Sequence, residues 1–284
     1  MIEVAERYIY PVKSMAGYQV PDERALKIGT HGVEGSRRWM IIDDEGKPVT
    51  ARQIGMQTLL AVHPTPVPTK EDGFIFSHIT ANTPVENTFE GPLHDLELFQ
   101  DKMRGQECSS KGTLWVQDYL SRKDVHLVHF NERAGRTVHK DKAWKGNDPR
   151  AFVDGAQITL YSHDTAADLQ TRWPGYDADP RRVRPDFVVR GTEPFEEFEW
   201  ARNKTRLQIG SVILEAQRPM DRCLMTRYHP DTLEPSKVFM QMITEELKMD
   251  IPDPNAAPAS CFAIGLRVVQ QGYIHSQAKV QVLG

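Results

Sequence analysis

The chain contains little cysteine, no long hydrophobic run and no excess of positive charge. Its 284 residues include three cysteines, Cys108, Cys223 and Cys261, which are odd in number and far apart. This spacing suits neither a disulfide framework nor a zinc finger, and it favours reduced thiols in the cytoplasm. No apolar run approaches the roughly 20 residues that span a bilayer. The acidic first seven residues match no signal or transit peptide, so we expect a cytoplasmic protein without a membrane span.

Charge and motif content exclude further classes of protein. Lysine and arginine number 35 against 39 acidic residues, which gives a net charge of −4. This balance provides no electrostatic footprint for nucleic acid, and we expect no such partner. The sequence also lacks internal repeats and the P-loop, GxGxxG, HExxH, CxxC and GxSxG motifs. With 39% hydrophobic and 26% charged residues, it has the composition of a soluble globular protein of one large or two ordinary domains.

Strand-like runs separated by turns dominate the sequence. The runs of the first part are 4–10, 37–42, 48–53, 73–77 and 96–99, and a tight turn at 43–46 predicts a hairpin between the second and the third. Residues 113–120 predict a short helix with Thr113 as its N-cap, and 125–130 begin a second series of strands. Ser162 and Ser236 are predicted to cap two later helices. We predict a mostly β (α+β) fold, with a curved sheet or β-barrel domain over 1–120 and a second β domain with a few peripheral helices over 121–284.

The segment 218–232 carries the most suggestive chemistry. It follows a strand-like run at 212–216 and places the thiol of Cys223 between Arg222 and Arg227. Nearby positive charge stabilises a thiolate, which can serve as a nucleophile, a redox thiol or a ligand of a soft metal ion. The alternative is a cysteine that is buried as a small apolar side chain.

A second group of residues predicts an anion site. Lys13 and Ser14 lie in a turn directly after the first strand, where an ammonium, a hydroxyl and exposed backbone N–H groups together suit phosphate. Arg37, Arg38 and Arg52 lie at the ends of the predicted hairpin and would form a second arm of an anion clamp. The alternative is an ordinary solvated turn with surface arginines.

Other polar residues allow two interpretations each. Arg184 and Asp186 enter a strand, where they either hold a planar polar ligand or form a local salt bridge worth ~0–1 kcal/mol. Ser162 begins a helix whose free N–H groups would face the end of the preceding strand. His126 and His129 fall on opposite faces of one strand, so they cannot chelate one metal ion together and are interpreted as core or surface histidines.

Four separated segments, taken together, resemble the two-domain MOSC proteins, in which an N-terminal MOSC β-barrel domain precedes a MOSC β-barrel domain. The segments are Tyr10-Pro-Val-Lys-Ser14, the hairpin end Val49-Thr-Ala-Arg-Gln53, Arg184-Pro-Asp-Phe-Val-Val189, and Arg222-Cys223 with Thr226 and Pro230-Asp-Thr232. The resemblance spans nearly the whole chain, and the segments occur in family order. The family includes the mitochondrial amidoxime-reducing component and bacterial relatives.

The resemblance implies a molybdenum cofactor and the reduction of N-hydroxylated or N-oxide-type small molecules. Cys223 matches the cysteine that ligates the metal, and Lys13, Ser14 and Arg37 match positions that hold the pterin phosphate. Arg184 and Asp186 match an Arg-Pro-Asn segment that contacts the pterin, with Asp in place of Asn. Ser162 and Thr226 are expected near the cofactor, and Asp231 or His229 is expected to relay protons. Met220-Asp221 replaces the Cys-Ser that usually precedes the ligand.

Three hypotheses follow. The first is a molybdenum-dependent reductase that takes electrons from a separate donor protein, because the sequence encodes no second redox centre. The second is a non-catalytic carrier of the cofactor, or of sulfur as a Cys223 persulfide. The third is a barrel protein in which Cys223 is only structural.

Overall fold

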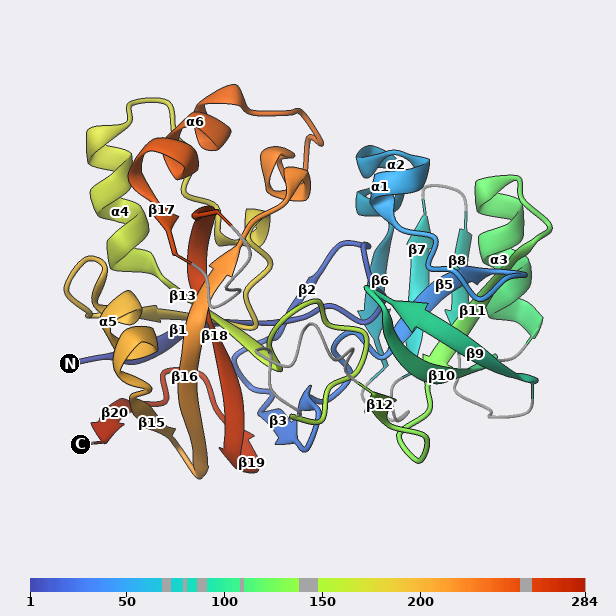
Figure 1. The fold of residues 1–284 in the computed structure, drawn as a ribbon, viewed down its shortest axis with the longest axis horizontal. Helices are drawn as coiled ribbons and strands as arrows, with labels where there is room; N and C mark the ends of the chain where they lie inside the picture. Colours follow the sequence, from blue (N-terminus) through green and yellow to red (C-terminus); the bar gives the residue numbers. More distant parts are fainter. Residues whose placement is uncertain are drawn as a thin grey trace. The chain divides into compact units, whose positions relative to one another are not determined.

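The computed structural model divides the chain into two compact units (Figure 1). It describes residues 1–67, 73–78, 81–85, 91–107, 110–137, 148–250 and 257–283. The first unit joins 1–8, 19–34 and 155–284, and the second joins 9–18 and 35–154. Each unit is therefore assembled from separated parts of the chain.

The first unit is built on a nine-stranded sheet. Its strands, in sheet order, are β2 (Tyr18–Gln19), β1 (Glu3–Ile9), β14 (Phe187–Arg190), β13 (Ile158–Ser162), β18 (Ala259–Gln270), β16 (Val212–Asp221), β15 (Arg206–Ile209) and β20 (Val280–Leu283), with β17 (Lys248–Met249) beside β18. Strand β16 alternates between buried and partly exposed residues until its last position. Three register shifts interrupt its pairing with β18, and such bulges bend and twist a sheet.

Short helices and a small sheet complete the first unit. The sheet contains β19 (Gly272–Ile274), β3 (Leu26–Gly29) and β4 (Gly32–Val33). The helices are α4 (His163–Arg172), α5 (Glu196–Asn203), α6 (Lys237–Glu246) and the 3-10 turns η2 (Pro180–Arg182) and η3 (Leu224–Arg227). Ser162 accepts a bond from the Thr165 N–H and Ser236 one from the Phe239 N–H, which confirms both predicted helix caps.

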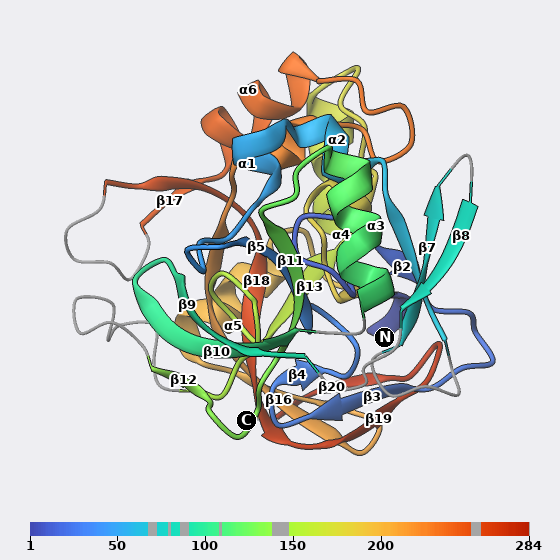
Figure 2. The same cartoon turned by 90° about the vertical axis from the view of Figure 1, so that its right-hand side faces the viewer.

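The second unit contains two antiparallel sheets and three described helices. One sheet runs β12 (Arg136–Thr137), β10 (Asp101–Glu107), β11 (Val125–Phe130), β5 (Trp39–Asp43), with β9 (Leu93–Leu98) also paired to β10. The other runs β6 (His63–Pro66), β7 (Phe74–His78), β8 (Ala81–Val85). The helices are α1 (Ala51–Ile54), α2 (Met56–Leu60) and α3 (Ser110–Leu120). Figure 2 shows α3 together with the strands β9, β10 and β11 of this unit.

The predicted mostly β fold class is confirmed, and two local predictions are wrong. Residues 48–53 do not form a return strand: only Pro48 bridges to Ile42, and α1 begins at Ala51. The Gln53 side chain accepts a hydrogen bond from the Thr50 N–H. This cap stabilises the start of α1, so the segment is helical although its residue pattern predicts a strand. Thr113 lies inside α3 and not at its start. In the described part of the chain, no helix combines the length and apolarity needed to cross a bilayer.

Candidate functional site

Cys223 lies where the longest strand pair of the first unit ends. Strand β16 stops at Asp221, and Cys223 is the N-cap residue of η3, with extended backbone. The Cys223 carbonyl accepts bonds from the Thr226 N–H at 3.2 Å and the Thr226 hydroxyl at 2.9 Å. Thr226 is buried, and its role here is to close this turn.

Two arginines hold the Cys223 turn from either side. The Arg222 guanidinium donates to the carbonyls of Phe262, at 2.5 Å, and Val183, at 2.9 Å. Buried Arg182 donates to the Arg227 carbonyl at 3.0 Å and pairs with Asp177 at 2.9 Å. These bonds fix the backbone on both sides of the cysteine.

The thiol itself is available for chemistry. Cys223 is half-buried and not in a disulfide, whereas Cys261 is fully buried and burial raises the pKa of its thiol to about 11. Among the described residues, no hydrogen bond reaches the Cys223 sulfur. A fixed, half-buried and unbridged thiol matches what a soft metal ion requires of a protein ligand. Cys108 lies outside the described residues.

Asp186 and Ser162 are tied into the sheet. The Asp186 carboxylate is fully buried and accepts the Thr159 N–H at 2.9 Å, while the Asp186 carbonyl accepts the Tyr8 N–H. Asp186 thereby links β13 with β1. The Ser162 hydroxyl caps α4 and lies 2.8 Å from the Thr192 hydroxyl. Both side chains have evident structural tasks besides the predicted cofactor contacts.

Asp231 is engaged in a charged pair. Both of its carboxylate oxygens accept from Arg181, at 2.8 and 2.6 Å, and Arg181 also binds Asp179. The neighbouring His229 ring accepts the Asp231 N–H at 3.1 Å through Nδ1. Asp231 and His229 thus lie together, but the Asp231 carboxylate is held in an ion pair by Arg181, which it shares with Asp179.

Lys13 and Arg37 lie within one charged cluster of the second unit. Lys13 is buried, forms an ion pair with Asp154 and donates to the Phe152 carbonyl at 3.1 Å. The Asp154 side chain is exposed, and the neighbouring cations Lys13, Arg52 and Arg37 hold the pKa of its carboxyl below its ordinary value. Asp154 could not be predicted from the sequence, because it lies in a polar segment 141 positions after its partner Lys13. Arg38, predicted with Arg37 and Arg52 to form the second arm of the clamp, pairs with Glu132.

A fourth cation strengthens the positive character of this cluster. Arg136 is within Coulombic range of Lys13 and pairs with Asp101 at 2.7 Å. Lys13, Arg37, Arg52 and Arg136 all interact electrostatically with the Asp154 carboxylate. Such a cluster favours an anionic ligand such as a phosphate group.

Three predicted site residues have left-handed backbone, which is uncommon outside glycine. Their φ values are 70° at Ser14, 53° at Arg37 and 54° at Arg184. Left-handed conformations of this kind cost of order 1–3 kcal/mol and cluster at functional sites. At Arg37 this strain is offset by two backbone bonds: its N–H donates to Tyr10, and its carbonyl accepts from Phe152.

Comparisons with known proteins identify the class. Residues 1–123 match the family model described as the MOSC N-terminal beta barrel domain, and 147–281 match that of the MOSC domain. The chain therefore belongs to the two-domain MOSC proteins, as its sequence segments predicted.

Individual relatives are more distant. The chain is 29% identical over 238 residues to mitochondrial amidoxime reducing component 2 of Rattus norvegicus, which covers 81% of this chain and 67% of the rat protein. It is 27% identical over 262 residues to mitochondrial amidoxime-reducing component 1 of Homo sapiens, and the match covers 87% of this chain and 74% of the human protein. Among solved structures, the YUAD protein from Bacillus subtilis superposes with a TM-score of 0.45 at 11% identity, over 99% of this chain and 96% of that chain.

Proposed function

We propose that this chain is a molybdenum-cofactor-binding reductase of N-hydroxylated or N-oxide-type small molecules. The observation that carries the proposal is the half-buried, unbridged thiol of Cys223 on a turn held by Arg222 and Arg182. The membership in the MOSC family and the similarity to proteins named as amidoxime-reducing components supply the reaction class. When bound, the cofactor would supply the two-electron chemistry that removes oxygen from the substrate.

Several residues of the first unit have defined tasks in this proposal. Cys223 ligates the metal as a thiolate, and its turn presents the sulfur at a fixed position because Thr226 closes the turn. Arg184 contacts the pterin, and Asp186 keeps the strand beside it in register. Ser162 is assigned to the cofactor surroundings. A proton relay through Asp231 requires that the carboxylate leave or share Arg181.

The cluster around Lys13 is assigned to the cofactor phosphate. Lys13, Ser14 and Arg37 supply an ammonium, a hydroxyl and a guanidinium, the donors that suit a phosphate group. The Lys13 ammonium forms an ion pair with Asp154 in the structure. A bound phosphate must therefore share Lys13 with this carboxylate or displace it. Truncation of Lys13 is therefore expected to weaken retention of the cofactor and to release Asp154 from its ion pair.

The test is metal analysis followed by an activity assay. Protein from a host competent for cofactor synthesis should contain close to one molybdenum per chain, and Cys223→Ala should lose it. Cys261→Ala is the matched control, because it removes a thiol that is fully buried. Wild-type protein should then reduce an amidoxime or a hydroxylamine with an artificial reductant. Protein without molybdenum would overturn the proposal.

The same assays separate the alternative. Molybdenum without turnover would favour the non-catalytic carrier of cofactor, or of sulfur as a Cys223 persulfide. Because the sequence contains no four-cysteine cluster motif, the reductase would take its electrons from a separate donor protein. A cytoplasmic location is part of the proposal, and fractionation of expressing cells tests it.

A further inference from the structure

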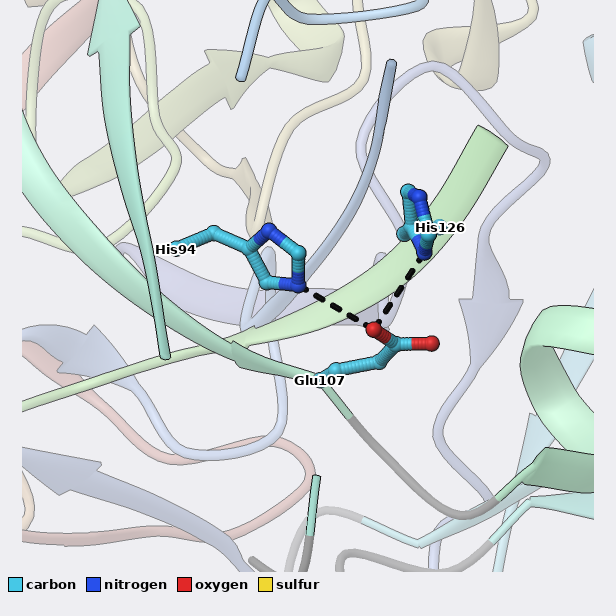
Figure 3. Close-up of side chains that lie close together, drawn as sticks. All are labelled: His94, Glu107 and His126. Carbon is cyan, nitrogen blue, oxygen red and sulfur yellow. Dashed lines mark hydrogen bonds and ion pairs between the residues drawn. The ribbon is translucent and has the colours of Figure 1, made fainter. Parts of the chain in front are cut away.

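The second unit contains a group of metal-binding side chains that the sequence did not predict. His94, Glu107 and His126 each offer one ligand atom, and these atoms all lie within 4.8 Å of one another. Glu107 lies between the two rings: its Oε2 is 3.1 Å from His94 Nε2 and 3.2 Å from His126 Nδ1 (Figure 3). All three side chains are half-buried.

The strand register explains why these residues meet. His94 on β9 lies opposite Gly105 on β10, and Glu107 follows Gly105 by two positions on the same face. Glu107 lies opposite Val128 on β11, and His126 precedes Val128 by two positions on the same face. The three residues are diagonal neighbours on adjacent strands, within reach of their side chains.

Most other side chains on this face are apolar and belong to the core of the unit: Met40, Ile42, Leu96, Leu98, Met103, Val128 and Phe130. Buried Asp101 is on the same face at the other end of β10. The two histidines and Glu107 therefore lie at one end of a mainly hydrophobic layer. Their exposed fractions are 20% for His94, 14% for Glu107 and 21% for His126, which leaves an ion a path to enter.

The outer contacts of the cluster resemble those of a metal centre. His126 uses Nδ1 toward Glu107, and its other nitrogen, Nε2, lies 2.8 Å from Asp44. The Thr113 hydroxyl donates to the second oxygen of Glu107 at 3.0 Å. A carboxylate on the far nitrogen of a histidine fixes the tautomer and the orientation of a metal-ligating ring.

The distances also suit a small divalent ion. Ligand bonds of about 2.0–2.1 Å at tetrahedral angles place neighbouring ligand atoms roughly 3.3 Å apart. The two distances from Glu107 are 3.1 and 3.2 Å. Two imidazoles and one carboxylate favour zinc and similar transition metals over magnesium or calcium, which prefer oxygen ligands.

We propose that His94, Glu107 and His126 form a binding site for one zinc-type transition-metal ion, with Asp44 and Thr113 orienting the ligands. The ion would connect β9, β10 and β11 where the core of the second unit ends. The site is distinct from the proposed cofactor site, because none of its ligands is a residue assigned to the cofactor.

Another described group, Asp179, His229 and Asp231, also has ligands in close proximity. Both of its carboxylates already bind the Arg181 guanidinium, at 2.6 Å each. A fixed positive charge at this position opposes a cation. Among the described residues, no arginine or lysine forms an ion pair with His94, Glu107 or His126, so this group is the stronger candidate.

The test is calorimetric titration of the full chain, freed of metal by a chelator, with Zn²⁺ at mildly alkaline pH, where imidazoles are neutral. Wild-type protein and Cys223→Ala should each bind one ion at this site. The double variant His94→Ala/His126→Ala should lose this binding. Asp44→Asn should weaken it about 10–100-fold, the usual effect of removing an outer partner of a metal ligand.

A matched double variant controls for the loss of two imidazoles. His63 and His163 are exposed, and His63→Ala/His163→Ala should bind Zn²⁺ as the wild type does. Glu107→Gln keeps the size of the side chain and should also lose binding, which covers the case in which the histidine variant fails to fold. Absence of zinc binding in the wild type would overturn the proposal. Unchanged zinc affinity in His94→Ala/His126→Ala would do the same, and His229→Ala would then locate the ion.

Discussion

Glu197 gives the most sensitive test of the energetics of this fold. It lies in α5 of the first unit, and its side chain is fully buried. The Thr165 hydroxyl donates to the Glu197 carboxylate at 2.8 Å, but burial outweighs this bond and raises the pKa of Glu197 to about 7. The neighbouring Glu199 is 53% exposed and pairs with Arg202, which makes it a matched control in the same helix.

The sign of the effect follows from the direction of this shift. Since the folded pKa lies above the unfolded one, the folded state binds more protons between the two values. Stability is therefore lost as the pH rises from about 4.5 to about 7. The ionised carboxylate costs about 0.8 kcal/mol at pH 5 and about 3 kcal/mol at pH 7 on this shift. Glu197→Gln keeps an oxygen for the Thr165 hydroxyl and removes this cost.

We expect the stability of Glu197→Gln relative to wild type to rise by about 2 kcal/mol between pH 5 and pH 7. Because a chain of two units can unfold in more than one step, the measurement is native-state hydrogen exchange of peptides from α5 and β16. Glu199→Gln should change stability by no more than about 0.5 kcal/mol at either pH. A relative stability of Glu197→Gln that is the same at both pH values would refute the assignment of a destabilising buried carboxylate.

Two further substitutions test other parts of the structure. Asp101→Asn should destabilise the second unit by about 3–5 kcal/mol in denaturant unfolding, because it leaves the Arg136 guanidinium buried without its charge partner. The exposed control Asp118→Asn should cost at most about 1 kcal/mol, and equal losses would contradict this reasoning. Ser236→Ala should cost about 0.5–2 kcal/mol, since the cap on the Phe239 N–H is lost, and faster hydrogen exchange at the start of α6 should report it. Unchanged exchange there would show that Ser236 does not stabilise α6.

Local chemistry made several features predictable from the sequence. Ser162 and Ser236 each precede a helix whose first N–H groups need an acceptor. Each serine hydroxyl accepts from the N–H three positions later, so the cap depends only on neighbouring residues of the sequence. The mostly β character follows from short runs of alternating residues between turns. The MOSC segments around Lys13, Arg184 and Cys223 were also recognisable, because a family pattern depends on residue identity and order.

The tertiary structure decided which distant groups meet. Lys13 has Asp154 as its partner because the backbone brings together positions 141 residues apart, and neither residue type reveals this pairing. His126 and His129 do lie on opposite faces, but a periodicity of two within one strand cannot show that neighbouring strands place His94 and Glu107 beside His126. The register of β9, β10 and β11 supplies that information.

The sequence by itself thus determined the fold class, the caps of α4 and α6 and the membership in the MOSC family, because these depend on local pattern and residue identity. Only the tertiary structure decided the partners of Lys13, the burial of Glu197 and the meeting of the two histidines with Glu107. These features depend on strand register and on long-range packing, which local propensities do not encode.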